Sequence, residues 1–201
     1  MDRSKVTLRD AEPLYEEGIL FARYLDAIAP FYRVMLGRRV VETIAVTFTQ
    51  LGHDLSYENT IFAEHDGAIV GMISGYATAG HRSSMGSPLQ EALGGRALRF
   101  RIMARLMARQ QWFLGTYAPG DFYIQGLVVD EEHRGQGIGF ALMDAMEERA
   151  HASGSKRLIL NVAAKNEAAR KLYSRRGLTV EAGWPKLPLI PPFVLRMARS
   201  I

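Results

Sequence analysis

The chain has 201 residues, 48% of them hydrophobic and 23% charged, which is the composition of a globular protein that can bury a sizeable core. The formal net charge of +4 at pH 7 favours an anionic ligand but does not by itself indicate nucleic acid. The absence of cysteine excludes disulfides, thiolate nucleophiles and cysteine-based metal sites.

The first quarter of the chain predicts one short strand followed by two or three helices. Residues 5–9 alternate polar and apolar side chains as a strand does, and the acidic residues of Asp10–Pro13 indicate a helix start. Between Leu14 and Leu51 apolar residues recur at helical spacing, with interruptions near Pro30 and Gly37. We therefore expect separate helices here rather than one long helix.

A β-hairpin is predicted next, because residues 60–76 hold two β-type runs joined around Asp66-Gly67. Residues 81–95 are rich in glycine and serine and predict a loop, which leads into an amphipathic helix at 97–113. On that helix one stripe is charged and another apolar: Arg101, Arg105 and Arg109 against Leu98, Ile102, Leu106 and Phe113. We interpret the charged stripe as a solvated helix face.

The carboxyl-terminal half alternates strands and helices in its hydrophobic pattern. The elements expected there are a strand at 122–129, a helix at 138–150, a strand at 157–162, a helix at 167–176, and final strands at 178–184 and 193–197. Asn166 precedes the second of these helices and is a residue type that favours the N-cap position.

Three glycines, Gly135, Gly137 and Gly139, lie between the strand predicted at 122–129 and the helix predicted at 138–150. Free backbone N–H groups of such a loop and of the first helical turn converge on one small volume, which attracts an anion. Glycine lets the backbone approach phosphate oxygens and permits the positive φ of a tight turn. Arg134 adds a positive charge at the rim of this volume.

Two well-known phosphate-binding loops do not fit this pattern. A P-loop requires Gly-Lys-Ser/Thr where this chain has Ile138-Gly139-Phe140. A dinucleotide-binding fold requires Gly-x-Gly-x-x-Gly and an acidic residue about twenty positions later, where this chain has Leu158 or Ile159. A glycine-rich turn without a ligand stays open as an alternative when the loop is taken alone.

A second motif lies downstream and runs from Asn166 through Tyr173 to Leu178. Together with Arg134-x-x-Gly137-x-Gly139, it resembles the GNAT superfamily of acyl-CoA-dependent N-acetyltransferases. The resemblance in residues covers about 122–178, whereas the earlier strand, helices and hairpin agree with the family only in layout. It implies a single α/β domain over residues 1–201, with a mixed, mostly antiparallel sheet flanked by helices and a V-shaped cofactor cleft between two central strands.

The resemblance also implies acetyl-CoA as the cofactor. In this family a loop of this type cradles the pyrophosphate of coenzyme A at a helix N-terminus, and the preceding strand hydrogen-bonds the pantetheine arm through its backbone. The cofactor-binding residues implied in this chain are Leu127, Val128, Val129, Arg134, Gly135, Gln136, Gly137, Ile138, Gly139 and Asn166. A backbone N–H near Val129 would polarise the thioester carbonyl.

Tyr173 matches the tyrosine that commonly protonates the departing thiolate in this family. A phenol with a pKa near 10 can serve a thiol with a pKa near 8.5. Some relatives that acetylate protein N-termini carry a glutamate five residues before the cofactor-binding asparagine, but this chain has Asn161, whose amide cannot act as a base. The open candidates for the general base are Glu64, Asp121, Tyr123 and a chain of water molecules.

The function expected from these observations is direct transfer of acetyl from acetyl-CoA to a primary amine in a ternary complex, with a small molecule as the acceptor. A protein N-terminus or lysine as acceptor, and a non-catalytic acyl-CoA-binding module, stay open as alternatives. No metal site is expected, because the five histidines lack the spacing of metal ligands.

We expect a cytoplasmic protein without nucleic-acid or membrane partners. The N-terminal residues lack the pattern of a signal peptide, and no run of eighteen apolar residues occurs. A homodimer is compatible with the sequence.

Overall fold

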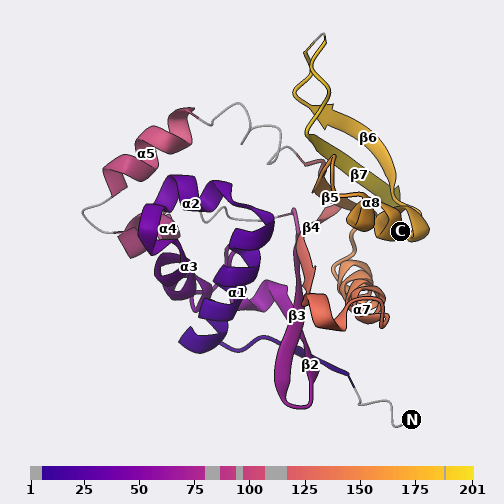
Figure 1. Cartoon of the computed structure of the whole chain (residues 1–201), viewed down its shortest axis with the longest axis horizontal. Coiled ribbons are helices and arrows are strands. Elements are labelled where there is room, and N and C mark those ends of the chain that lie inside the picture. The colour runs from indigo at the N-terminus through magenta and orange to yellow at the C-terminus, as the bar shows by residue number, and fades with distance from the viewer. Residues whose placement is uncertain (1–5, 80–86, 94–96, 107–116, 188) are drawn as a thin grey trace.

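The computed structural model of the chain describes residues 6–79, 87–93, 97–106, 117–187 and 189–201. Figure 1 shows a central sheet with helices on both faces. Within these described ranges, no helix combines the length and the apolar character needed to cross a lipid bilayer.

The sheet has seven strands in the order β1-β2-β3-β4-β5-β7-β6. The strands are β1 (Thr7–Asp10), β2 (Thr60–His65), β3 (Ala68–Ala77), β4 (Asp121–Val129), β5 (Arg157–Ala163), β6 (Thr179–Trp184) and β7 (Val194–Ser200). β4 and β5 pair in parallel, and the other neighbouring strands pair antiparallel. The prediction of a mixed, mostly antiparallel sheet flanked by helices is therefore confirmed.

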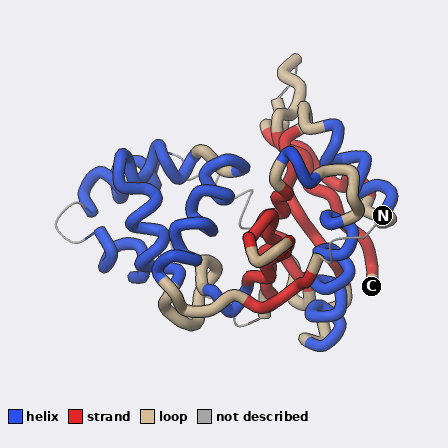
Figure 2. Tube along the Cα trace, turned by 60° about the horizontal axis from the view of Figure 1, so that its bottom comes forward, coloured by secondary structure: helices blue, strands red, loops and turns tan. Residues whose placement is uncertain are grey.

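The helices form two groups, one on each face of the sheet (Figures 1 and 2). The first group is α1 (Tyr15–Ile28), α2 (Phe31–Leu36), α3 (Val40–Phe48), α4 (Ser87–Leu93) and α5 (Ala97–Leu106). The second group is α7 (Ile138–Ala152) and α8 (Glu167–Arg175). Three short 3-10 turns, η1 (Gly37–Arg39), η2 (Tyr57–Asn59) and η4 (Glu131–His133), connect these elements.

Each group of helices covers its own hydrophobic core, because successive side chains of a strand point to opposite faces. On β3, Met72 packs into the core shared with α1 and α3, whereas Ile73 packs into the core shared with α7. Phe21 and Phe48 stack at 4.9 Å between ring centroids in the first core. The sheet thus separates a face covered by α1 to α5 from a face covered by α7 and α8.

The hairpin predicted around Asp66-Gly67 is confirmed. Asp66 has φ 51° and Gly67 has φ 78°, so both turn residues adopt the left-handed conformation that a two-residue hairpin turn requires. Two or three helices were expected between Leu14 and Leu51, and the structure has α1, α2 and α3 there.

Two expectations about the helical group are wrong. Asp10 ends β1 and α1 begins at Tyr15, so the helix starts later than the acidic residues of Asp10–Pro13 indicated. Within the expected loop 81–95, residues Ser87–Leu93 form α4. Short polar or glycine-rich segments become helical when tertiary contacts supply the burial, and Leu89 of α4 is fully buried.

The helix expected at 97–113 is described as far as Leu106, and its apolar stripe was assigned to the wrong face. Phe100 is buried against α2 and the first core, whereas Leu98 and Ile102 are exposed. The buried face of this helix is therefore the one that carries Phe100. The expected Arg109 and Phe113 lie outside the described residues.

Candidate active site

β4 and β5 separate halfway along their length. Their parallel pairing joins residues 121–124 of β4 to residues 157–160 of β5 and ends at Ile124 and Leu160. Beyond that vertex, β4 continues to Val129 paired with β3, and β5 continues to Ala163 paired with β7. The two strands therefore enclose the V-shaped opening that was expected between two central strands.

A β-bulge on β4 lies at this vertex. Gly75 pairs with Ile124 and Ser74 pairs with Gly126, which leaves Gln125 as the extra residue of the bulge. A bulge bends its strand and increases the local twist. The bend turns the second half of β4, with Leu127, Val128 and Val129, away from β5. These three residues are half-buried, and no strand in the described structure pairs with their β5-facing edge.

The glycine loop follows β4 directly and leads into α7. Gly135 has φ 76° and Gly137 has φ 87°, and a Cβ built on either would meet nothing within 4 Å. Both therefore adopt a conformation that disfavours other residues, and both face open space. Gly139 differs, because a Cβ there would lie 3.1 Å from Leu172 Cδ1 of α8. We conclude that the first two glycines shape the loop and the third allows α7 and α8 to pack closely.

The backbone N–H groups of Gly135 to Gly139 have no hydrogen-bond acceptor within the described part of the chain. Successive free N–H groups at a helix N-terminus form a concave site for an anion, and the helix dipole adds to the attraction. A pyrophosphate group fits this donor set, because it offers several charged oxygens and needs close approach of the backbone. The residues present are thus suited to hold the pyrophosphate of acetyl-CoA.

Arg134 ties the loop to the end of β4. Its Nε donates a hydrogen bond to the Val129 carbonyl oxygen at 3.0 Å, while the side chain stays largely exposed. Gln136 Nε2 donates to the Glu132 carbonyl oxygen at 3.3 Å. Asp130, between the strand and the loop, is hydrogen-bonded to Tyr24 of α1, a contact that nothing in the local sequence indicated. These contacts hold the glycine loop at the mouth of the opening.

Asn166 caps α8, as expected. Its Oδ1 accepts a hydrogen bond from the Ala169 backbone N–H at 3.1 Å, and the residue is exposed. The cofactor contact that the resemblance implies for this side chain stays a prediction.

Tyr173 lies on α8 and is buried in the core that α7 and α8 cover. Burial, together with a smaller electrostatic effect of Tyr123, raises the pKa of its hydroxyl to about 12. The hydroxyl is therefore protonated at neutral pH and is available as a hydrogen-bond or proton donor.

Glu64, one candidate for the general base, is held in an ion pair away from the opening. Its Oε1 lies 2.6 Å from Arg9 Nε, and Arg9 also contacts Glu17 at 2.8 Å. Glu64 belongs to β2, which β3 separates from β4 in the sheet. This geometry favours a structural role for Glu64.

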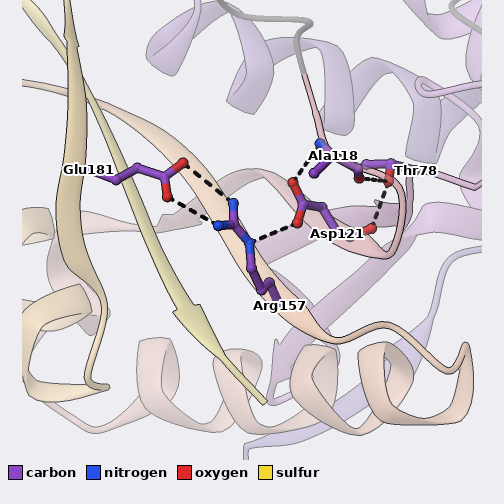
Figure 3. Close-up of polar contacts among 5 residues, drawn as sticks. All are labelled: Thr78, Ala118, Asp121, Arg157 and Glu181. Carbon is purple, nitrogen blue, oxygen red and sulfur yellow. Dashed lines mark hydrogen bonds and ion pairs between the residues drawn. The ribbon is translucent and has the colours of Figure 1, made fainter.

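Asp121, the second carboxylate candidate, locks the first half of β4 to its neighbours (Figure 3). Its side chain accepts hydrogen bonds from the Ala118 backbone N–H and from Arg157 Nε, both at 2.9 Å. Arg157 also contacts Glu181 of β6 at 3.4 Å, and Thr78 Oγ1 donates to the Asp121 carbonyl oxygen at 2.9 Å. Asp121 is almost fully buried at the end of β4 opposite the glycine loop. This geometry favours a structural role for Asp121 as well.

A group of polar side chains that the sequence did not bring together lies on the α1-to-α5 face of the sheet, around the vertex. We call it the vertex cluster, and its members are Tyr32, Asp54, Tyr76, Tyr117, Tyr123, Gln125, Asn161 and Arg196. The rings of Tyr76 and Tyr117 lie 5.6 and 4.6 Å from that of Tyr123 between centroids. Asn161 Nδ2 donates to the Tyr123 hydroxyl at 3.2 Å.

Charged groups of both signs act on this cluster. Arg196 Nε donates to Asn161 Oδ1 at 3.2 Å, and its guanidinium lies 5.9 Å from the centre of the Tyr117 ring. Asp54 is buried, and its carboxylate raises the pKa of Tyr32, Tyr76, Tyr117 and Tyr123, in each case after the larger effect of burial. The residues come from α2, the loop before η2, β3, the segment before β4, β4, β5 and β7, so only the tertiary fold could reveal them. Among the described residues, no group of three or more acidic or histidine side chains could hold a metal ion.

Comparison with known proteins identifies the family of this chain. A model described as the acetyltransferase (GNAT) family matches residues 24–178 of the chain. The uncharacterized N-acetyltransferase YobR of Bacillus subtilis is 38% identical over 68 residues, which are 33% of this chain and 28% of that protein. Mycothiol acetyltransferase of Corynebacterium aurimucosum is 38% identical over 65 residues, 32% of this chain and 21% of that protein.

The matched segments thus span less than a third of these two relatives. A crystal structure described as that of an acetyltransferase matches 96% of this chain and 98% of its own, with a TM-score of 0.66 and 23% identity. At that identity the likeness is one of fold.

Proposed function

The chain belongs to the GNAT acetyltransferase family, and from this premise we propose that it transfers an acetyl group from acetyl-CoA to the primary amine of a small molecule by direct attack in a ternary complex. The observation that carries the proposal is the pairing of two features at one opening. The free N–H groups of Gly135 to Gly139 stand at its mouth, and the unpaired edge of β4 lines its wall.

Acetyl-CoA supplies an activated thioester when it is bound. The loop from Arg134 to Gly139 would hold its pyrophosphate, and the backbone of Leu127, Val128 and Val129 would hydrogen-bond its pantetheine arm as an added strand does. Asn166 would contribute a side-chain contact. Occupation of the opening would supply the hydrogen bonds that this edge of β4 lacks.

Tyr173 is the proposed donor to the departing sulfur. Its raised pKa keeps the phenol protonated, and a thiol with a pKa near 8.5 needs only a hydrogen bond or a proton to leave. A backbone N–H near Val129 would stabilise the negative charge that develops on the carbonyl oxygen.

The acceptor would meet the thioester from the face that carries the vertex cluster. Tyrosine rings attract an ammonium group, and the Asp54 carboxylate favours a cation. The buried positions of Tyr32, Tyr76 and Tyr123 favour a small acceptor over a protein segment. Mycothiol acetyltransferase is among the proteins to which the chain is similar. A protein N-terminus or lysine is the second candidate, because the helical group beside the sheet leaves apolar side chains such as Val34 exposed.

We also propose that residues 1–201 act as one domain. Adjacent residues of β2 support this, since Ile61 contributes to the core under α7 and Phe62 to the core under α1 and α3.

The experiment that tests this function is the release of free thiol from acetyl-CoA in the presence of amines, polyamines, amino acids and peptides. The protein contains no cysteine, so a thiol reagent detects only released coenzyme A. We expect amine-dependent release with a small amine, and peptide-only release would favour the second candidate. Acetyl-CoA that stabilises the fold without any release across the panel would contradict the transferase and favour a non-catalytic binding module.

Tyr173→Phe tests the proposed acid within the same assay. We expect turnover to fall by about 10²-fold while acetyl-CoA binding, measured by calorimetry, stays unchanged. Unchanged turnover would refute the role of Tyr173.

A further inference from the structure

We propose that Ile28 of α1 limits the length of the acyl group that the chain transfers, so that acetyl is accepted and longer acyl groups such as butyryl are excluded. The inference rests on the proposed function and names a specificity-determining residue for it. It follows from the close packing of Ile28 against Gly126, the first residue of β4 beyond the bulge.

Ile28 lies directly on the backbone of Gly126. A Cβ built on Gly126 would lie 2.3 Å from Ile28 Cδ1 and 3.8 Å from Ile28 Cγ1, and the first of these distances is too short for a real Cβ atom. The φ angle of Gly126 is not positive, so the backbone conformation does not require a glycine there. A glycine inside a strand often marks the close approach of another group. We conclude that Gly126 makes room for Ile28.

A second contact places α1 along the whole open half of β4. Tyr24 lies one helical turn before Ile28, and its hydroxyl is hydrogen-bonded to Asp130, directly after the end of β4. Residues four apart lie on the same face of a helix, so Tyr24 and Ile28 face the strand together. The helix therefore covers the open half of β4, from Gly126 to Asp130, on the first face of the sheet.

The other face of the open half is closed by packed side chains. A Cβ built on Gly139 would lie 3.1 Å from Leu172 Cδ1 and 4.0 Å from both Leu127 Cδ2 and Val129 Cγ2. These three side chains pack against the core that α7 and α8 cover. An acyl chain in the opening would thus meet a filled surface on this face.

The proposed direction of the cofactor brings its acyl end to the same corner. With the pyrophosphate at the glycine loop and the arm along Leu127 to Val129, the acyl group would lie at the inner end of the arm, nearest the vertex. There β4 pairs with β5 from Ile124 inward, and the hydrogen bond from Asn161 to the Tyr123 hydroxyl, at 3.2 Å, crosses the opening. This leaves the face of α1, where Ile28 stands, as the side toward which a longer chain would extend.

The exposure of Ile28 suits a residue that selects a ligand. Its side chain is 41% exposed, whereas Ile124 at the vertex is buried. Shortening Ile28 therefore enlarges the opening without leaving a closed cavity in the core. One methylene too many in an apolar site changes specificity by about 10- to 100-fold, which is the range expected between acetyl and butyryl.

The first test compares kcat/KM for acetyl-, propionyl- and butyryl-CoA, measured by thiol release, in the native chain, Ile28→Val and Ile28→Ala. The readout is the ratio of the butyryl-CoA value to the acetyl-CoA value, because a ratio does not depend on the fraction of protein that is folded. We expect a native ratio of about 10⁻² and an increase of at least about tenfold in Ile28→Ala. Ile28→Val lacks the Cδ1 methyl group nearest Gly126 and should admit propionyl more readily than butyryl.

Two outcomes of this comparison would overturn the proposal. One is a native chain that uses butyryl-CoA as well as acetyl-CoA. The other is an Ile28→Ala ratio within about threefold of the native ratio. In either case amine-dependent release from acetyl-CoA would leave the proposed function standing.

Ile102→Ala is the matched control, because Ile102 is an isoleucine of the same helical group and is 49% exposed. It lies on α5, which packs against α2 and α4 and stands away from β4 in Figure 1. The acyl ratio of this variant should stay within about threefold of the native ratio. A change as large as that in Ile28→Ala would contradict a role specific to Ile28.

Gly126→Ala in the Ile28→Ala background tests where the acyl end lies. In the native chain the added methyl group would collide with Ile28 Cδ1, but in the double variant it occupies part of the space that the shortened side chain leaves. We expect it to restore the preference for acetyl by roughly fivefold over Ile28→Ala alone. An unchanged ratio would contradict the placement of the acyl end beside Gly126.

Calorimetric titration with coenzyme A, acetyl-CoA and butyryl-CoA provides a readout that does not depend on turnover. The native chain should bind butyryl-CoA roughly tenfold more weakly than acetyl-CoA, and Ile28→Ala should bind the two within about threefold. Coenzyme A should bind equally to both chains, because the glycine loop holds its pyrophosphate. A chain that binds acetyl-CoA but acetylates no amine contradicts the proposed function, and equal native binding of acetyl-CoA and butyryl-CoA contradicts the role of Ile28.

Discussion

The two halves of β4 differ in their pairing partners and in their burial. Residues 121–124 are hydrogen-bonded to β3 on one edge and to β5 on the other, and Asp121 anchors them to Ala118 and Arg157. Beyond the bulge residue Gln125, residues 126–129 pair with β3 and with no other strand that the structure describes, and the chain then leads into the glycine loop. The closed half is buried, whereas Leu127 to Val129 in the open half are half-buried.

This difference shows how a sheet can leave part of one strand edge unpaired and open to a ligand. An unpaired strand edge costs stability, so it persists only if the strands are fixed elsewhere. Here the ion pair at Asp121 fixes one end, the bulge at Gln125 redirects the strand, and Arg134 ties the loop to the other end. The vertex cluster lies at the border between the two halves.

Alkaline pH should lower the free energy of unfolding, because buried tyrosines around the vertex then ionise. This is the largest effect that we expect. The pKa of Tyr173 is raised to about 12, and burial also raises the pKa of Tyr24, Tyr32, Tyr76, Tyr117 and Tyr123. A raised pKa contributes stability that is fully present below pH 10, the value in an unfolded chain, and is lost as the pH rises toward 12. For Tyr173 alone this amounts to roughly 3 kcal/mol.

Urea unfolding at pH 8, 10 and 11.5 measures this loss. Tyr173→Phe should lose less stability over the same range, because it removes one of the buried phenols. A free energy of unfolding that stays constant from pH 8 to 11.5 would contradict the burial of these hydroxyls.

Asp121→Ala should loosen the closed half of β4. It leaves the Ala118 N–H and the inner side of Arg157 without their buried acceptor, and we expect a loss of about 2–3 kcal/mol in the free energy of unfolding. The value lies at the lower end for a buried pair because Arg157 is partly exposed and keeps Glu181.

Glu181→Ala is the matched control for Asp121→Ala, because it removes the outer, solvent-screened partner of the same arginine. It should cost less than about 1 kcal/mol in urea unfolding. Equal losses from the two variants would show that Asp121 is no special anchor.

Gly137→Ala should impair the open end, with a smaller effect. Gly137 at φ 87° and Gly154 at φ 72° stand at opposite ends of α7, and a Cβ at either would meet nothing within 4 Å. Both alanine variants carry the same left-handed strain, so both should lose about 1 kcal/mol of stability. Only Gly137→Ala places a methyl group at the proposed pyrophosphate site, and we expect acetyl-CoA binding to weaken roughly tenfold there and to stay unchanged in Gly154→Ala. Calorimetric titration with acetyl-CoA compares the two, and equal binding would argue against the loop as the cofactor site.

Local features of the site were predictable from the chain itself. The turn at Asp66-Gly67, the cap at Asn166 and the glycines between β4 and α7 depend on backbone conformations that a few neighbouring residues specify. The same local reasoning failed at α4 and at the buried face of α5, where Leu89 and Phe100 gain their burial from distant helices. It also left Glu64 and Asp121 open as bases, because their arginine partners, Arg9 and Arg157, lie 55 and 36 residues away in the chain.

The sequence by itself determined the family, the order of most strands and helices, and the loop suited to an anion, since periodicity and glycine spacing are properties of short segments. Only the tertiary structure decided where β4 and β5 part, which carboxylates are locked in ion pairs, and which side chains meet at the vertex. Tyr123, Asn161 and Arg196 belong to three different strands, and their hydrogen bonds depend on the register between those strands. That register is set by the packing of the whole sheet, which no single segment encodes.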